Sequence, residues 1–452
     1  MKLLSKGKID ATEGNLWMQI FQYAIPLIIG TLIQTFFNAV DMIVLGNMAD
    51  SSAVASVGAT TSIVHLVVNS FVGIAGGAKV ILAHQFGAKV SDSIKRTVDT
   101  SILTALGMGL FIALIGVPFA PGMLHITNCP ADCFEGAVIY IQIYVASAPA
   151  ILLYNFGSAV LTASGDSQRP LYYIIFSGLI NVILNIILCM VLPQKVLAVA
   201  LATAVSQLIG AFLVIRRLCM IEGDGKLVLK AMVYDLRSLG QIMSQGLPMA
   251  LTSALYPFAN LQIQSAINTF GVSAIAGNSA CSTLEGIPGA FCGAFNSTTA
   301  VFMGQNLGAG NKERVSQTFR RCMAINIVVG LVAGISMNLA GRFLLGFFLP
   351  NDPQGVDYGM IRMFYVCGFY VIACIKGILS AAVQTFGYAS FSALASIIWV
   401  CGFRLFWMFF IYPHFQTFDM LMACFIVSWS LVMFTEIYGY FHFRNRVKIR
   451  VH

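Results

Sequence analysis

A single carboxylate, Asp41, lies in an otherwise apolar run near the start of the chain. Gln34, Asn38 and Asp41 follow one another at i, i+4 and i+7, so they share one face of a helix. A charged side chain at the centre of a bilayer costs at least about 2.5 kcal/mol. This stripe therefore predicts the wall of a cavity or an ion site. A hydrogen-bonded contact between helices, without transport chemistry, is the alternative.

Two asparagines later in the first half carry a similar signal. Asn181 and Asn185 are one helical turn apart, and Thr203 lies on the next predicted helix. Amide and hydroxyl oxygens with one carboxylate can bind a sodium ion or stabilise a protonatable acid. Asp41, Asn181, Asn185 and Thr203 are therefore the candidate cation-coupling residues, although spacing alone does not bring their helices to one point.

Polar groups in the second half point more weakly to a substrate cavity. Gln262 and Gln264, with Asn260 and Asn268, make one predicted helix unusually polar. The candidate cavity residues are Gln34, Asn38, Gln262, Gln264, Glu285 and Lys376. The alternative is that the charged groups pair internally and serve only packing; these groups are Glu285, Lys376, Arg404 and Glu436.

The composition requires a membrane. Of 452 residues, 58% are hydrophobic and 10% are charged, with mean hydropathy +0.83, whereas soluble proteins carry about 25% charged residues. Apolar runs long enough to span a bilayer as helices recur along the whole chain. We predict an all-α membrane protein of about twelve spans, near 16–45, 52–82, 97–119, 135–163, 170–192, 196–217, 239–269, 274–303, 318–348, 357–385, 390–411 and 416–442.

Basic residues orient these spans. With the N-terminus inside, Lys and Arg gather in the loops on that side, and the alternate loops hold only Lys195 and Arg342, with Arg362 close by. Because positive charge marks cytoplasmic loops, both termini are expected in the cytoplasm. The net charge of +8 is explained in this way, so no nucleic-acid partner is expected. The basic and polar residues 1–15 do not resemble a cleavable signal peptide.

The chain also carries an internal duplication. Ala53 and Gly87 return as Ala274 and Gly308, about 221 residues later, and Pro26 returns as Pro248. The matching loop charges make the two halves parallel repeats. We predict an N-terminal lobe (1–218), a cytoplasmic linker (219–238) and a C-terminal lobe (239–452).

Enzyme chemistry has little support. The sequence has no P-loop, no HExxH and no GxSxG motif, and its six histidines are scattered. The eleven cysteines show no metal-ligand spacing. Cys129 and Cys133 lie in an expected external loop, and the sequence does not decide whether they form a disulfide.

Several motifs together resemble the multidrug and toxic compound extrusion (MATE) transporters over nearly the whole chain. They are Asn38-Ala-Val-Asp41, HQFGAK at 84–89, GQNLGAGNKERV at 304–315, ASGDSQRP at 163–170, NVILN at 181–185 and VALATAVSQ at 199–207. The resemblance implies two six-helix lobes forming a V. It also implies a monomeric antiporter of the bacterial cytoplasmic membrane, embedded in lipid. Its substrates would be small organic compounds, cationic or amphipathic, exported against H+ or Na+ without a cofactor.

The resemblance places the coupling-ion site, including any Na+, at Asp41, Asn181 and Thr203. Where many members have a second acid, this chain has Asn185. The site's formal charge is therefore −1, which weakens sodium binding and favours proton coupling, although an amide oxygen can still bind sodium. The mechanism we expect is neutralisation of Asp41 by the incoming ion, with a shift of the first helix at Pro26 and release of the substrate.

Three other functions are weighed against export. A lipid or lipid-linked oligosaccharide flippase of the same superfamily would hold pyrophosphate with Lys79, Lys376 and Arg404, but the carboxylate in the first span argues against it. A membrane-embedded enzyme would need a cluster of His, Asp or metal ligands at one face. A passive channel usually assembles as an oligomer around a filter motif, which a duplicated single chain does not suggest.

Overall fold

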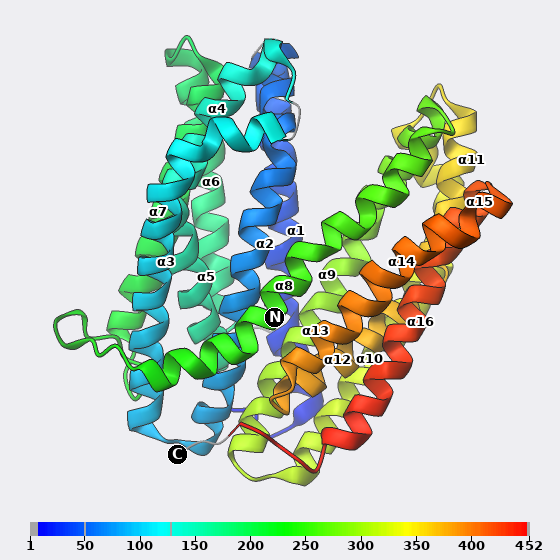
Figure 1. Ribbon diagram of the computed structural model, residues 1–452. Helices are drawn as coiled ribbons and strands as arrows, with labels where there is room; N and C mark the ends of the chain where they lie inside the picture. The colour runs from blue at the N-terminus through cyan, green and yellow to red at the C-terminus, as the bar shows by residue number, and fades with distance from the viewer. Residues whose placement is uncertain (1–7, 49–50, 127–128, 450–452) are drawn as a thin grey trace. The chain divides into compact units, whose positions relative to one another are not determined.

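The computed structural model describes residues 8–48, 51–126 and 129–449, and every regular element among them is helical (Figure 1). This confirms the predicted all-α class. The helices group into two compact units, which are described separately.

Among the described residues, unit 1 comprises 8–10 and the described part of 25–250. Its elements are most of α1 (Leu16–Met48), α2 (Ser51–Ala88), α3 (Ser91–Ile126), α4 (Ala131–Ala146), α5 (Ala148–Ala163), α6 (Gln168–Val191), α7 (Lys195–Met220), η1 (Leu229–Ala231) and the first part of α8 (Leu236–Asn268).

Unit 2 comprises residues 11–24 and 251–450. Its elements are the start of α1, the rest of α8, α9 (Val272–Gly308), α10 (Lys312–Phe348), α11 (Pro353–Arg362), η2 (Met363–Cys367), α12 (Tyr370–Thr385), α13 (Ala389–Ser396), η3 (Ile397–Gly402), α14 (Phe403–Phe406), η4 (Trp407–Ile411), α15 (Tyr412–Phe415) and α16 (Phe418–Phe443). The elements η2, η3 and η4 are π-helical.

Two helices change unit along their length, and each does so next to a proline. α1 passes from unit 2 to unit 1 after Ala24, beside Pro26. α8 passes from unit 1 to unit 2 after Ala250, beside Pro248. A proline inside a helix removes one backbone hydrogen bond and permits a kink. This grouping follows packing, whereas the predicted division at 219–238 follows the sequence repeat and stays a prediction.

Helices that could cross a membrane can be identified by their length and their apolar composition. Among the described residues, nine helices are long and apolar enough to cross a bilayer, and the pair α4 and α5, bent by 46°, would make ten. The predicted spans 239–269 and 274–303 are present as α8 and α9, of 33 and 37 residues. They fall outside this set because polar and small side chains lower their hydropathy. Composition alone thus identifies nine or ten crossings among the described residues, and α8 and α9 account for the two other predicted spans.

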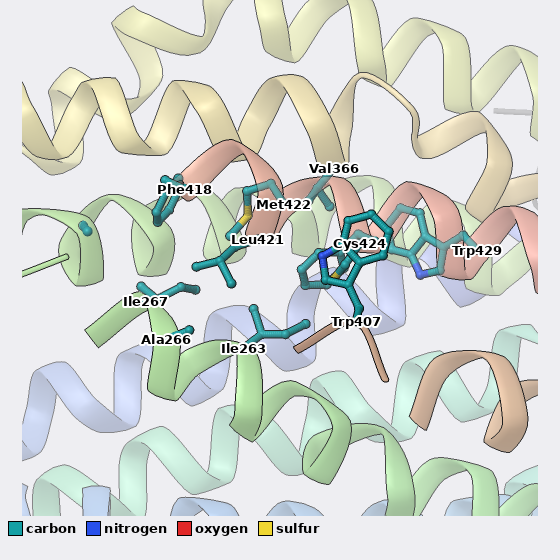
Figure 2. Close-up of a cluster of buried hydrophobic side chains, with 12 residues drawn as sticks. Ile263, Ala266, Ile267, Val366, Trp407, Phe418, Leu421, Met422, Cys424 and Trp429 are labelled. Atoms are coloured by element: carbon teal, nitrogen blue, oxygen red, sulfur yellow. The ribbon is translucent and has the colours of Figure 1, made fainter. Parts of the chain in front are cut away.

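Unit 2 is apolar on both its inner and outer faces. Figure 2 shows a buried cluster in which α16 contributes Phe418 and Trp429, and η4 contributes Trp407. On α10, by contrast, Leu339, Phe343 and Phe347 share one face and are 84%, 80% and 83% exposed. Such a stripe is stable only against lipid or a partner protein, as a membrane protein requires.

The segment that leads into α8 is anchored on α3 in unit 1. The backbone N–H of Val233 donates to Asp99 at 3.2 Å, and that of Asp235 donates to Thr100 at 3.0 Å. Ser238 donates to Asp235 through its hydroxyl and its backbone N–H, and these bonds lower the pKa of that carboxyl. The predicted linker therefore ends in a capped helix start.

Glycines allow α2 and α8 to approach closely within unit 1. A Cβ on Gly77 would overlap the backbone nitrogen of Gly246, and one on Gly246 would lie 2.8 Å from the Cα of Ile74. Small residues allow this contact between helices where the hydrophobic effect gives little attraction.

Replacing Gly77 tests this packing. Gly77→Ala must push α2 and α8 apart, and we expect it to lower the free energy of unfolding by about 1–3 kcal/mol. The matched control is Gly107→Ala on α3, where a Cβ meets nothing within 4 Å; it should be neutral or stabilising. The measurement is the thermal unfolding midpoint of each variant in one detergent. Equal midpoints for the two variants would contradict the close approach.

Candidate functional site

The structure brings Asp41 together with both predicted asparagines in unit 1. Asp41 on α1 is half-buried, whereas Asn181 and Asn185 on α6 are 6% and 0% exposed. Asn185 Nδ2 donates to Asp41 Oδ1 at 2.6 Å. The amide of Asn181 faces the same carboxylate, and with its nitrogen turned inward it donates to Oδ1 at 2.7 Å and Oδ2 at 3.2 Å. One acid thus accepts from two amides on a neighbouring helix.

Thr203 takes a different role in the structure. Its hydroxyl donates to the backbone oxygen of Val199, one turn earlier on α7, at 3.0 Å. The hydrogen bonds recorded for Asp41 in the described part of the chain come from α6. Three of the four predicted coupling residues therefore meet directly, and a role for Thr203 in ion binding stays a prediction.

The two amides favour an ionised carboxylate, because each presents N–H donors to it. The oxygen Oδ1 of Asn185 is buried and accepts no hydrogen bond among the described residues, and an orphaned acceptor of this kind is costly. A sodium ion, or a proton on Asp41, would need an oxygen facing the carboxylate. Rotation of the Asn185 amide would supply that oxygen, so the group can serve either state of the acid.

Unit 2 contains a buried ion pair that joins two predicted cavity residues. Arg362 Nε and Nη2 donate to Glu285 Oε1 and Oε2 at 2.7 and 2.9 Å, which is a bidentate pair. Arg362 Nη1 donates to Asn278 at 2.7 Å, and Asn278 donates to Gln264 at 3.2 Å. Gln264 in turn donates to Asn268 at 3.0 Å. Internal pairing, the alternative held open for Glu285, is what the structure contains.

Sequence reasoning missed Arg362 and Asn278. Arg362 was placed beside an outer loop, yet it is 8% exposed at the C-terminal end of α11. Glu285 lies 77 residues earlier, and no local periodicity links positions so far apart. The one signal in the sequence is that charged side chains inside apolar helices are costly and often pair with one another.

Lys376 and Arg404 form a second polar group in unit 2. Lys376 Nζ donates to the hydroxyl of Tyr256 at 2.9 Å. Arg404 donates from Nε to Ser428 at 3.1 Å and from Nη1 to Asn260 at 2.8 Å. Both cations therefore rest on neutral partners, unlike Arg362.

The remaining predicted cavity residues are Gln34, Asn38 and Gln262. Gln34 on α1 and Gln262 on α8 are exposed, and the side chain of Asn38 lies outside the described part of the structure. Glu436 on α16 is fully buried and accepts from Ser392 at 3.2 Å. No role in a cavity follows from these positions.

The cysteines do not build a metal site. Cys129 and Cys133 are free thiols. Cys281, Glu285 and Cys367 each place a ligand atom within 4.8 Å of the other two. Because Arg362 already engages both oxygens of that carboxylate, its positive charge opposes a metal ion there.

Comparison with known proteins gives consistent matches over nearly the full length. A family model described as MatE matches residues 26–187 and again 248–410, so the predicted duplication is confirmed. The chain is 24% identical over 447 residues to the probable multidrug resistance protein YoeA of Bacillus subtilis (strain 168), covering 96% of this chain and 95% of that one. It is 24% identical over 388 residues to the probable multidrug resistance protein YpnP of the same strain, covering 84% of each.

Among solved structures, the chain superposes with a TM-score of 0.86 on a MOP superfamily transporter from Pyrococcus furiosus, covering 98% of both chains at 19% identity. That protein is described as having a binding pocket of reverse polarity that suggests a different function. At this identity the similarity concerns the fold.

The ion pair of unit 2 predicts a stability difference. Glu285→Gln leaves Arg362 buried without a carboxylate, which should lower the free energy of unfolding by about 3–5 kcal/mol. The control is Asp357→Asn, which breaks the exposed pair with Arg342 and should cost less than about 1 kcal/mol. The measurement is the thermal unfolding midpoint of each variant in one detergent. Similar decreases for the two variants would contradict a larger stabilisation by the buried pair.

Proposed function

The chain belongs to the MatE family, and from that premise we propose that it is a secondary active antiporter that exports small organic compounds, cationic or amphipathic, in exchange for H+ or Na+. The family consists of membrane transporters, so the chain is a transporter rather than an enzyme. Export is supported by the relatives YoeA and YpnP, which are named as probable multidrug resistance proteins.

The observation that carries the proposal is the environment of Asp41. Its carboxylate lies inside an apolar helix, and the hydrogen bonds it accepts come from the amides of Asn181 and Asn185. No cation of the described residues lies within ion-pair distance of it. An acid that is desolvated but not cancelled by a salt bridge remains able to bind an incoming cation.

The proposed cycle uses this acid as the switch. With Asp41 ionised, the amides of α6 hold it by their N–H groups. When a proton or sodium ion neutralises it, those donors lose their acceptor and the Asn185 amide turns its oxygen inward. The contact between α1 and α6 therefore differs between the two states, and Pro26 gives α1 a weak point at which to respond. Alternating access requires such differential contacts between two conformations.

The formal charge of the site favours one coupling ion over the other. Asp41 supplies one formal negative charge, and Asn181 and Asn185 are neutral. Sodium binding by oxygen ligands strengthens with the number of carboxylates, so a single acid favours H+. Na+ stays the second candidate, because two amide oxygens could join the carboxylate.

We further propose a bacterial cytoplasmic membrane location, with both termini in the cytoplasm and the monomer as the working unit. The asymmetry of Lys and Arg between alternate loops supports this orientation. The partners are then the exported small molecule and the surrounding lipid.

A lipid or lipid-linked oligosaccharide flippase is the second candidate. The observation in its favour is the pair of cations Lys376 and Arg404, which rest on neutral side chains in unit 2. Cations of this kind could hold a pyrophosphate group. The acid of α1 has no evident task in a passive flippase, so we rank this function below export.

Neutralising Asp41 tests the proposed coupling. Asp41→Asn should reduce gradient-driven dye efflux from proteoliposomes to the background rate, since an amide cannot exchange a proton or a charge with the incoming ion. Asp92→Asn, at an exposed acid of the same unit, should transport normally. Efflux by Asp41→Asn at the wild-type rate, in correctly folded protein, would refute the role of this acid.

A second prediction concerns ion selectivity. Asn185→Asp places a second carboxylate beside the first, which raises the formal charge of the site to −2. The variant should show a stronger response of efflux to an imposed Na+ gradient than the wild type does. The assay compares separately imposed sodium and pH gradients. If sodium dependence does not change, the charge of the site does not select the ion.

A further inference from the structure

Arg404 is the most deeply buried cation without an acidic partner in the described part of unit 2. The residue is 2% exposed. Its hydrogen bonds go to the hydroxyl of Ser428 and the amide oxygen of Asn260, and its guanidinium lies 4.2 Å from the centre of the Phe425 ring. All three partners are neutral. A buried charge that is not paired is costly, so the fold holds Arg404 for a reason other than an internal salt bridge.

Lys376 extends this positive region. Its ammonium group donates to the Tyr256 hydroxyl at 2.9 Å and lies 5.9 Å from the centre of the Trp429 ring. The ring of Trp429 lies 6.0 Å from the ring of Phe425, against which Arg404 packs, so the two cations border one pair of rings. Asn260, which accepts from Arg404, is exposed. The two charges therefore belong to one cluster with an exposed polar edge.

The charges inside unit 2 do not balance. Arg362 is neutralised by Glu285 in a bidentate pair. Glu436 is fully buried and accepts from the hydroxyl of Ser392 at 3.2 Å. Among the described residues of the interior of unit 2, the cations Arg362, Lys376 and Arg404 thus outnumber the acids Glu285 and Glu436 by one. An interior that is positive by one charge attracts an anion and repels a cation.

Aromatic rings form the apolar part of the same cluster. Phe425 and Trp429 lie one turn apart on α16, with ring centres 6.0 Å apart, and Trp429 is visible at the buried cluster of Figure 2. Tyr370 meets Trp429 edge to face at 6.2 Å. Rings of this kind bind flat apolar bodies beside a charged group.

The backbone at Arg404 has an unusual form. Arg404 lies on the four-residue α14, between the π-helical segments η3 and η4. Arg362 directly precedes η2, the remaining π-helical segment described in unit 2. Such segments are rare in proteins, and those that occur are often found at functional sites.

We propose that Tyr256, Asn260, Lys376, Arg404, Phe425 and Trp429 form a binding site for an amphipathic organic anion, that is, a carboxylate, sulfonate or phosphate attached to an aromatic or apolar body. The guanidinium and ammonium groups bind the anionic head, and the rings bind the body. This inference rests on the proposed export function and names its substrate class. A cation would instead have to approach two positive charges in unit 2.

Equilibrium binding tests the site directly. The protein is reconstituted in lipid nanodiscs of neutral lipid, and fluorescence polarisation measures the binding of fluorescein, an aromatic carboxylate, and of ethidium, an aromatic cation. Arg404→Met and Lys376→Met should each weaken fluorescein binding by at least about tenfold, which corresponds to about 1.4 kcal/mol. Ethidium binding should not weaken. Arg404→Lys should retain part of the fluorescein affinity.

The control is Arg342→Met, which removes an exposed cation of the same unit and should leave binding of both dyes unchanged. Each variant is first checked for a single size-exclusion peak and for its thermal midpoint. Unchanged fluorescein binding by folded Arg404→Met would overturn the proposal. Equal weakening of both dyes, or wild-type protein that binds ethidium alone, would also overturn it.

Two further experiments are needed. The first distinguishes a lipid phosphate from a soluble anion as the ligand, and the second tests the anion site and the export function separately. Farnesyl diphosphate that displaces fluorescein more strongly than soluble aromatic carboxylates do would support the site and assign it to a lipid phosphate. Gradient-driven efflux is measured for both dyes in Asp41→Asn and in Arg404→Met. Asp41-dependent efflux of ethidium alone would sink the anion site and leave export intact. Arg404-dependent fluorescein binding without gradient-driven efflux would support the site and sink export.

Discussion

The account depends on one carboxylate that lies in a membrane helix and is held by amides instead of by a cation. Asp41 accepts hydrogen bonds from Asn181 and Asn185, and these bonds stabilise its charge without cancelling it. A lysine or arginine in their place would fix the acid in its ionised state. Neutral donors that can rotate leave both states accessible. The packing of α1 against α6 is therefore tied to the state of a single group.

The two units treat buried charge in opposite ways. In unit 1 the acid has neutral partners, and in unit 2 the cations Lys376 and Arg404 have neutral partners, while Glu285 and Arg362 cancel each other. These three charges, which have no oppositely charged partner among those recorded, are costly in an apolar environment. An incoming cation at the acid of unit 1 and an organic anion at the cations of unit 2 would each lower this cost. On our proposals, exchange of an ion for a substrate uses both sites.

Much of the fold could be predicted from the sequence, because apolar runs and their loop charges are local signals. Helical spacing identified Asp41, Asn181 and Asn185 as polar residues of apolar helices, but spacing did not bring their helices together, and a shared site was implied by the family resemblance alone. The Glu285 and Arg362 pair was not found, because its partners are distant in sequence and Arg362 was assigned to a span end. The π-helical segments around Arg404 were also invisible, since they change the helix without changing its hydropathy. Thr203, predicted from its residue type and also implied by the resemblance, donates to the backbone of its own helix.

Infrared difference spectroscopy on the reconstituted protein tests the central claim most directly. Spectra are recorded with the coupling ion bound and with the substrate bound, and the carboxyl bands are compared. The account predicts that the carbonyl band of a protonated acid, or a shifted carboxylate band if sodium is the ion, is present in the ion-loaded state alone and is missing in Asp41→Asn. Identical carboxyl bands in the two states of the wild-type protein would show that this acid does not change state, and would contradict the account.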